Sequence, residues 1–108
     1  MRNVLDDLPS ASADEQFEDI LRRPGVRIER IVSAGQVTPV DAPYCQAWDE
    51  WVLLLAGGAR LWIEGEGEGG GEHALRPGDQ HLIPAGRRHR VTWTSADPPT
   101  VWLAVHFS

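Results

Sequence analysis

The side chain best placed to do chemistry in this sequence is His89, which begins a β-rich run that ends at Thr94. Alternate side chains of an extended strand share a face, so His89, Val91 and Trp93 lie together on the apolar side. A histidine on that side is predicted to be buried, and a buried imidazole needs a polar partner. The simplest partner is a backbone carbonyl, so a reactive site at His89 requires a second group from elsewhere in the chain.

Of the three other histidines, two are candidates for such a site. His81 follows the turn at Gly78, and His106 stands near the end of an apolar strand in which both faces are apolar enough to point inward. Either imidazole can therefore reach the interior. His73 follows the glycine-rich segment 65–71, which is predicted to be a surface tip, and His73 is expected at the surface with it.

Composition limits the partners of the chain. The formal net charge is -6 and the isoelectric point is about 5.0, so most of this surface repels nucleic-acid phosphates. Arg87, Arg88 and Arg90 are a local exception that either receives an anionic substrate or pairs with acidic side chains. Cys45 is the one cysteine, which excludes an intrachain disulfide framework and favours the cytoplasm.

The elements that must position these groups are mostly strands. No apolar run is long enough to span a membrane, and the acidic N-terminus is untypical of a signal peptide. A short α-helix is expected over residues 10–23, because Ser12 and Glu15 match a capping box and Pro24-Gly25 follows. Its apolar face would carry Phe17, Ile20 and Leu21.

From Val26 onward the pattern is β. The strand 26–33 loses its alternation at Glu29-Arg30, which indicates a bulge or an edge strand paired with a second subunit. The apolar run 51–55 is predicted to be a strand buried on both faces and a neighbour of the strand 59–64, across Gly57-Gly58. Further strands at 73–75, 79–83, 89–94 and 101–107 bring the count to about seven or eight, which predicts a β-sandwich or barrel.

Four of these residues carry a specific resemblance. Gly78, Pro84, Gly86 and His89 have the spacing G-x5-P-x-G-x2-H, which resembles the second conserved motif of the cupin superfamily. Trp93 stands where that motif ends in asparagine. The resemblance extends over about residues 26 to 107.

The first cupin motif, G-x5-H-x-H-x3-4-E-x6-G, is matched in its second half by Glu50 and Gly57. Its two histidine positions fall on Tyr44 and Gln46, or on Pro43 and Cys45, depending on the gap. Gln46 is favoured, because a spacing of four residues keeps it on the same strand face as Glu50.

The resemblance implies an all-β fold, a double-stranded β-helix or jelly-roll barrel with a short N-terminal α-helix. Residues 1–25 would be the N-terminal extension and residues 26–108 the cupin barrel domain. Many cupins hold a divalent metal on three histidines and a glutamate. The metal ligands carried over to this chain are Glu50, His89 and Gln46, and the possible pocket residues are Tyr44, Trp48, His81 and His106.

Such a site would take iron, nickel, manganese or zinc, and the neutral amide of Gln46 makes it weaker than the family's usual site. Two functions stay open. One is a metal-dependent oxygenase, isomerase or lyase acting on a small polar molecule, and the other is a metal-free binding or sensor module. Glu50 and His89 are expected on adjacent strands that face one cavity. A homodimer is expected from exposed apolar strand residues such as Trp62 and from the slipped strand 26–33.

Overall fold

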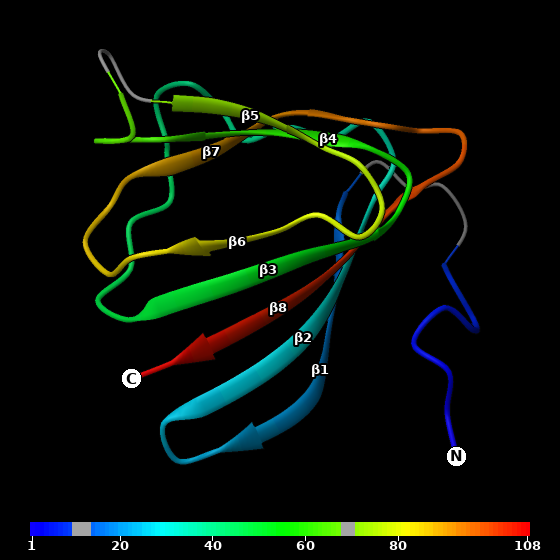
Figure 1. Cartoon of the computed structure of the whole chain (residues 1–108). Coiled ribbons are helices and arrows are strands. Elements are labelled where there is room, and N and C mark those ends of the chain that lie inside the picture. Colours follow the sequence, from blue (N-terminus) through cyan, green and yellow to red (C-terminus); the bar gives the residue numbers. More distant parts are fainter. Residues whose placement is uncertain (10–13, 68–70) are drawn as a thin grey trace.

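The computed structural model describes residues 1–9, 14–67 and 71–108, which form two antiparallel sheets packed face to face (Figure 1). The five-stranded sheet has the order β1-β2-β8-β3-β6 and the three-stranded sheet the order β5-β4-β7. Their bounds are β1 (Gln16–Arg23), β2 (Val26–Ser33), β3 (Asp49–Ala56), β4 (Ala59–Ile63), β5 (Gly71–Leu75), β6 (Gln80–Ile83), β7 (His89–Thr94) and β8 (Thr100–Phe107). The all-β sandwich predicted from the strand pattern is confirmed.

The predicted N-terminal helix is wrong. Residues 16–23 are β1, which pairs with β2, and the described residues contain no helix. Between Asp19 and Leu21 the register slips by one residue, so Ile20 is bulged, and the half-buried residues of β1 are Glu18 and Leu21, three positions apart. A bulged strand therefore imitates helical spacing. Residues 10–13 of the expected capping box lie outside the described residues, and the Glu15 carboxylate accepts a hydrogen bond from the Ser33 hydroxyl instead.

The lost alternation at Glu29-Arg30 has a different cause from the predicted bulge or edge. β2 pairs with β8 over its whole length and with β1 on its other side, so it is an interior strand. Glu29 and Arg30 point to opposite faces and both are buried, at 7% and 6% exposure. Arg30 donates hydrogen bonds to the carbonyl oxygens of Val4 and Asp6, which shows that the N-terminal segment covers the outer face.

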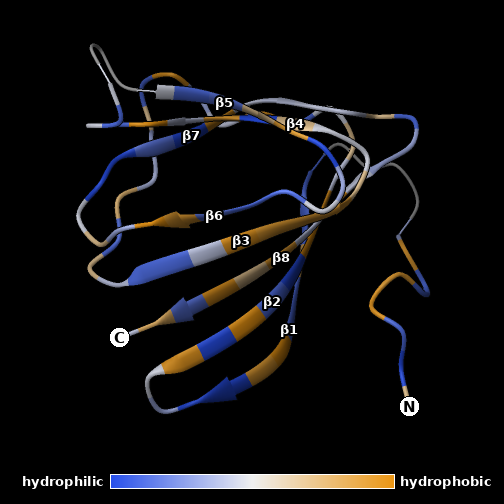
Figure 2. Ribbon diagram, viewed as in Figure 1, coloured by the Kyte–Doolittle hydropathy of each residue, from blue (hydrophilic) through white to orange (hydrophobic). Residues whose placement is uncertain are grey.

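The predicted pairing of the strand 51–55 with the strand 59–64 is also wrong, because the chain crosses from one sheet to the other between them. β3 and β4 belong to different sheets, and so do β6 and β7. β3 alternates between half-buried and buried positions, with Val52 and Leu54 inward, so it is not buried on both faces. Figure 2 shows β3 passing from hydrophilic at its start to hydrophobic toward the crossing.

The apolar core lies between the sheets, toward the end where β3 crosses to β4. It is formed by Val52, Leu54, Ala59, Leu61, Ile63, Leu75, Ile83, Trp102 and Ala104. At the other end of the same inner faces the strands carry polar side chains, including Glu29, Glu50, His89 and His106, all less than a tenth exposed. The described residues include no helix with the length and hydrophobicity needed to cross a membrane.

Substituting Gly57 should test the crossing between the sheets. Gly57 and Gly86 both have φ of +78°, but a Cβ at Gly57 would lie 2.7 Å from the Pro99 oxygen and 2.7 Å from the Thr100 Cα. A Cβ at Gly86 would meet nothing within 4 Å. Gly86→Ala should therefore lower the free energy of unfolding by about 1 to 2 kcal/mol, because alanine disfavours the left-handed backbone conformation. Gly57→Ala should lower it by at least about 1 kcal/mol more, because its Cβ also clashes with the neighbouring backbone. Urea denaturation of both variants measures the difference, and equal costs would contradict the close packing of the crossing.

Candidate functional site

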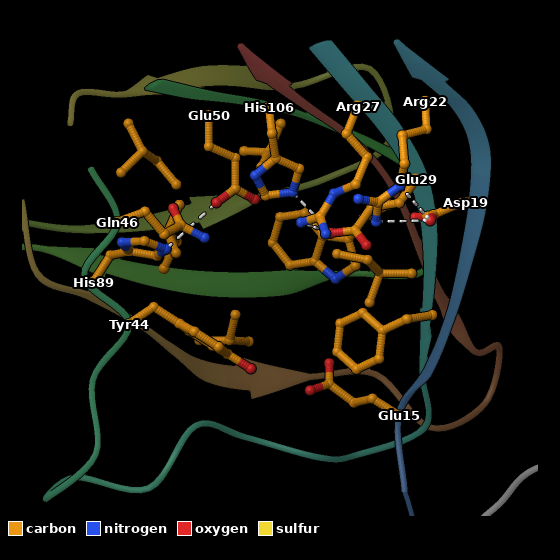
Figure 3. A pocket seen from close by; sticks show the side chains of 17 residues that line it. Glu15, Asp19, Arg22, Arg27, Glu29, Tyr44, Gln46, Glu50, His89 and His106 are labelled. Carbon is orange, nitrogen blue, oxygen red and sulfur yellow. Dashed lines mark hydrogen bonds and ion pairs between the residues drawn. The ribbon is translucent and has the colours of Figure 1, made fainter. Parts of the chain in front are cut away.

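A cavity of about 530 Å³ opens between the two sheets at their polar end (Figure 3). This volume lies within the range of small-molecule sites. The polar groups around it are four carboxylates, two guanidinium groups, two imidazoles, a phenol and an amide: Glu15, Asp19, Glu29, Glu50, Arg22, Arg27, His89, His106, Tyr44 and Gln46. The excess of carboxylates favours a cavity that admits a cation.

Glu50 and His89 face each other across this cavity. Glu50 is on β3 and His89 on β7, so they come from opposite sheets, and the expectation of adjacent strands is wrong. The Glu50 Oε1 lies 3.6 Å from the His89 Nε2, and both side chains are at least nine-tenths buried. That distance is too long for a good hydrogen bond.

The orientation of the His89 ring decides what this pair can do. Its Nδ1 lies 3.2 Å from the carbonyl oxygen of Arg87, which can only accept, so Nδ1 carries a hydrogen. In the neutral ring Nε2 therefore presents a lone pair to the Glu50 carboxylate. Two electron-rich groups in a buried site repel unless a proton or a cation lies between them.

The pair fits a divalent cation by its donor chemistry. Metal-ligating histidines usually donate their second nitrogen to a carbonyl or carboxylate, as His89 does to Arg87. Ligand bonds of about 2.0–2.2 Å place neighbouring donor atoms roughly 3 to 3.4 Å apart, close to the 3.6 Å between Nε2 and Oε1. Gln46 lines the same cavity and can add an amide oxygen.

Tyr44 is also in this part of the cavity. Its backbone pairs with His89, and its ring stacks on the imidazole with a centroid separation of 5.6 Å. Burial, followed by the negative charges of Glu15, Glu50 and Glu29, raises the pKa of the Tyr44 phenol. Tyr44 is therefore a neutral hydroxyl at physiological pH, able to donate a hydrogen bond, rather than a phenolate ligand.

The imidazole of His106 differs from that of His89 in its tautomer and in its hydrogen-bond partners. The Trp48 indole N–H donates to its Nδ1 at 2.9 Å, and its Nε2 lies 2.8 Å from the Glu29 Oε1. An indole nitrogen can only donate, so Nδ1 accepts and Nε2–H donates to Glu29. Both nitrogens of His106 are used, and the ring holds the Glu29 carboxylate in place at the cavity wall.

Arg27 completes a row of side chains across three strands. In the sheet register His106 of β8 lies opposite Arg27 of β2 on one side and opposite Glu50 of β3 on the other. The Arg27 Nη2 lies 3.7 Å from the Glu29 Oε1, and its Nε is buried without a hydrogen-bond partner in the described part of the chain. A buried guanidinium donor of this kind suits an anionic or hydroxylated ligand.

Of the residues selected from sequence, Tyr44, Gln46, Glu50, His89 and His106 all line the cavity. Trp48 lies behind His106 and lines a smaller cavity of about 220 Å³ with Arg27. His81 is placed elsewhere, with its Nε2 2.9 Å from Glu66.

Sequence reasoning does not select Glu29, Arg27 or Glu15, although all three line the cavity. Glu29 does leave a signal, because an acidic residue interrupts the alternation of β2 where that strand passes the polar end of the sandwich. The interruption suggests irregular strand pairing, whereas it marks a buried polar group.

Comparison with known proteins decides the family. The family model of the Cupin domain matches residues 30–106, which is most of the chain and includes Glu50 and His89. This chain is a cupin. The resemblance in the spacing of Gly78, Pro84, Gly86 and His89 is thereby confirmed.

Solved structures agree with this assignment. A Ralstonia eutropha protein, provisionally named mannose-6-phosphate isomerase, is 42% identical to this cupin, with a TM-score of 0.92. The alignment covers 100% of this chain and 97% of that one. No curated protein sequence matches the chain significantly.

More distant structures share only the fold. A cupin superfamily protein of Desulfitobacterium hafniense is 16% identical with a TM-score of 0.74, over 93% of this cupin and 83% of that chain. A Thermus thermophilus protein is 18% identical with a TM-score of 0.79, over 99% of this cupin and 95% of that chain. The neighbours establish a jelly-roll cupin and leave the reaction open.

The two cavity imidazoles should differ in tautomer. His89 is expected to carry its hydrogen on Nδ1 and His106 on Nε2, because a carbonyl accepts from the first and an indole donates to the second. Long-range ¹H–¹⁵N correlation spectra distinguish the tautomers of neutral histidines. Trp48→Phe should disturb the His106 signals and leave those of His89 unchanged. The same tautomer in both rings would contradict the hydrogen-bond arrangement described above.

Proposed function

We propose that this cupin binds a divalent metal ion and a small polar, anionic substrate in its barrel and catalyses proton transfer on that substrate, as an isomerase or lyase. The observation that carries the proposal is the His89 lone pair facing the buried Glu50 carboxylate at 3.6 Å. A cation between them removes the repulsion, and the excess of carboxylates around the cavity supports it.

Glu50, His89 and Gln46 would hold the ion. A bound divalent ion would polarise a carbonyl or hydroxyl oxygen of the substrate. Of these three ligands only His89 is an imidazole, and His106 has both nitrogens committed to Trp48 and Glu29. Non-haem iron oxygenases typically use two histidines and a carboxylate, so this donor set favours isomerase or lyase chemistry over the oxygenase alternative.

The remaining polar groups suit proton transfer at a carbon next to a carbonyl. Tyr44, kept protonated by its raised pKa, can donate to a substrate oxygen. Glu29 is a carboxylate held in place by His106, and it is suited to accept a proton. Arg27 has a buried Nε that can bind an anionic group of the substrate. The name of the Ralstonia eutropha relative, a sugar-phosphate isomerase, supports a substrate of this class.

The metal part of the proposal is tested by adding Mn²⁺ to ¹⁵N-labelled protein, because the ion broadens the signals of nearby residues. Broadening in the barrel should centre on residues 44–50 and on His89, and by elemental analysis wild-type protein purified without chelator should contain about one ion more than His89→Ala protein. His89→Ala and Glu50→Gln should each abolish the local effect. The stability of both variants should be monitored too, since loss of either partner leaves the other buried polar group unpaired, which lowers the free energy of unfolding by about 1 to 3 kcal/mol. Unbroadened signals around Glu50 in the wild type would remove the metal from the proposal.

The substrate part is tested at Arg27. Arg27→Gln should weaken the binding of mannose 6-phosphate at least about tenfold, because a charge-assisted hydrogen bond contributes about 1.5 to 3 kcal/mol. Unphosphorylated mannose is the matched control, and its binding should change much less. Equal effects on both sugars would show that Arg27 does not bind the anionic group.

A metal-free binding module is the second candidate, and one observation favours it. Tyr44 and Gln46 line the cavity, and on the favoured motif spacing they fall at the positions of two family ligands, where they supply only neutral oxygens and make the site poor for transition metals. If Mn²⁺ leaves the barrel signals unchanged while the sugar phosphate still binds, this second function is the correct one.

We also propose a homodimer, but with β1 in place of β2 as the strand at the interface. β1, rather than β2, is an outer strand of the five-stranded sheet and exposes Phe17 and Ile20, while Trp62 is partly covered by the Arg90 guanidinium. A second copy is expected along β1. Light scattering at micromolar concentration should give twice the chain mass, and a monomer would count against it. A cytoplasmic location stays a prediction.

A further inference from the structure

Two histidines and a glutamate meet outside the barrel cavity, at the edge where the two sheets separate. His73 is on β5, an outer strand of the three-stranded sheet, and His81 is on β6, an outer strand of the five-stranded sheet. Both lie on inward-facing positions of their strands, in alternation with the buried Leu75 and Ile83. Glu66 reaches them from the loop between β4 and β5.

The three side chains point their ligand atoms at one another. The His81 Nε2 lies 2.9 Å and 3.1 Å from the two carboxylate oxygens of Glu66. The His73 Nε2 lies 3.6 Å from the Glu66 Oε2, and the two imidazole centroids are 4.8 Å apart. One ligand atom from each of the three residues lies within 4.8 Å of the others. Side-chain rotations that move these ligand atoms by about an ångström would bring them to the roughly 3 to 3.4 Å that separates neighbouring donor atoms around a first-row metal ion.

One ligand atom in this group lacks a hydrogen bond. The His73 Nε2 is shielded from solvent and, among the described residues, is one of two buried side-chain nitrogens with no hydrogen-bond partner. Its nearest acidic oxygen, on Glu66, is already bonded to His81. A metal ion would give this nitrogen a partner that the protein does not supply.

Glu66 lies against the start of β5, where its backbone comes close to Gly71. A Cβ at Gly71 would lie 2.1 Å from the Glu66 carbonyl oxygen and 3.0 Å from the Glu66 Cβ, so only glycine fits there. The glycine therefore allows the Glu66 backbone to lie where its carboxylate reaches His81. This is a positioning role for a residue that touches no ligand itself.

We infer that Glu66, His73 and His81 form a second metal site, which takes zinc or a similar first-row transition ion and ties the two sheets together at their open edge. Two imidazoles and one carboxylate are a donor set found around zinc, with the fourth position left for water. β5 and β6 share no backbone ladder, so a bound ion would add a direct link between the sheets.

This site is separate from the barrel site and does not rest on the proposed function. None of Glu66, His73 and His81 lines the barrel cavity. In the register of β3 and β6, His81 lies opposite Val52 and Ile83 lies opposite Glu50. The buried side chains of Val52 and Ile83 line the cavity on that side.

The test uses Zn²⁺ and Co²⁺ as probes with the full chain. His89→Ala protein, which lacks the barrel ligand, should still bind one Zn²⁺ by calorimetry, and bound Co²⁺ should show the strong visible absorption of a four-coordinate site. At a hundredfold excess of Zn²⁺ over Kd the melting temperature should rise on the order of 10 °C. Adding His73→Ala or His81→Ala to the His89→Ala chain should abolish binding, the absorption band and the rise in melting temperature.

Two further variants separate a built site from incidental binding. Glu72→Gln removes an exposed carboxylate that neighbours His73 on the other face of β5 and is bonded to Arg60, and it should leave Zn²⁺ affinity unchanged. Gly71→Ala should lower the affinity at least tenfold by displacing Glu66, with both imidazoles intact. The inference is overturned if the His89→Ala protein binds no Zn²⁺, or if it binds Zn²⁺ equally with and without His73 and His81. Loss of metal at the barrel alone leaves this second site standing, so the two proposals fail separately.

Discussion

Two buried carboxylates, Glu29 and Glu50, set the main constraint on the interior of this protein. Each is less than a tenth exposed, and an ionised carboxylate in such a place costs several kcal/mol unless it is paired. Each faces an imidazole, but in different ways. Glu29 receives a proper hydrogen bond from His106 at 2.8 Å, whereas Glu50 stands 3.6 Å from the lone pair of His89. One half of the cavity is therefore complete within the protein, and the other half requires a proton or a cation.

The sheet register follows from the same constraint. Arg27, His106 and Glu50 form one row across β2, β8 and β3, and Glu29 lies two residues along β2 on the same face. Because side chains alternate with a period of two, a slip of one residue in β8 would turn His106 outward and leave Glu29 and Glu50 facing each other without it. The polar row thus specifies the register at this end of the sandwich, while the apolar core around Leu54 and Leu61 stabilises the other end.

Local chemistry could be predicted from sequence, and pairing between distant segments could not. The turn residues from Gly78 to Gly86 indicate where two strands end, and they do not tell whether the strands pair or enter different sheets, as β6 and β7 do. The bulge at Ile20 gives β1 a helical spacing, and only its ladder with β2 identifies it as a strand.

The candidate site divides in the same way. Glu50 and His89 could be selected because each lies in a local spacing typical of the family. Glu66 and His73 could not be, since their meeting with His81 depends on the close approach of Glu66 to Gly71 and on the approach of two outer strands. Interactions between segments that share no ladder leave no periodic signal in the sequence.

On the spacing that puts the two family histidines at Tyr44 and Gln46, the proposed barrel site gains two neutral oxygen donors, while Glu50 and His89 still need a proton or a cation between them. Neither a phenol nor an amide adds negative charge, and the raised pKa of Tyr44 keeps it in the neutral form. An ion held mainly by Glu50 and His89 would be bound weakly by the protein alone and would retain more positions for oxygen atoms of a substrate. A substrate that binds the ion and Arg27 together would then increase the affinity for the ion, and by linkage the ion would increase the affinity for the substrate. In the function proposed for this cupin, a weak metal site and the buried donor on Arg27 would therefore be compatible parts of one arrangement, in which ion and anionic substrate bind as a pair.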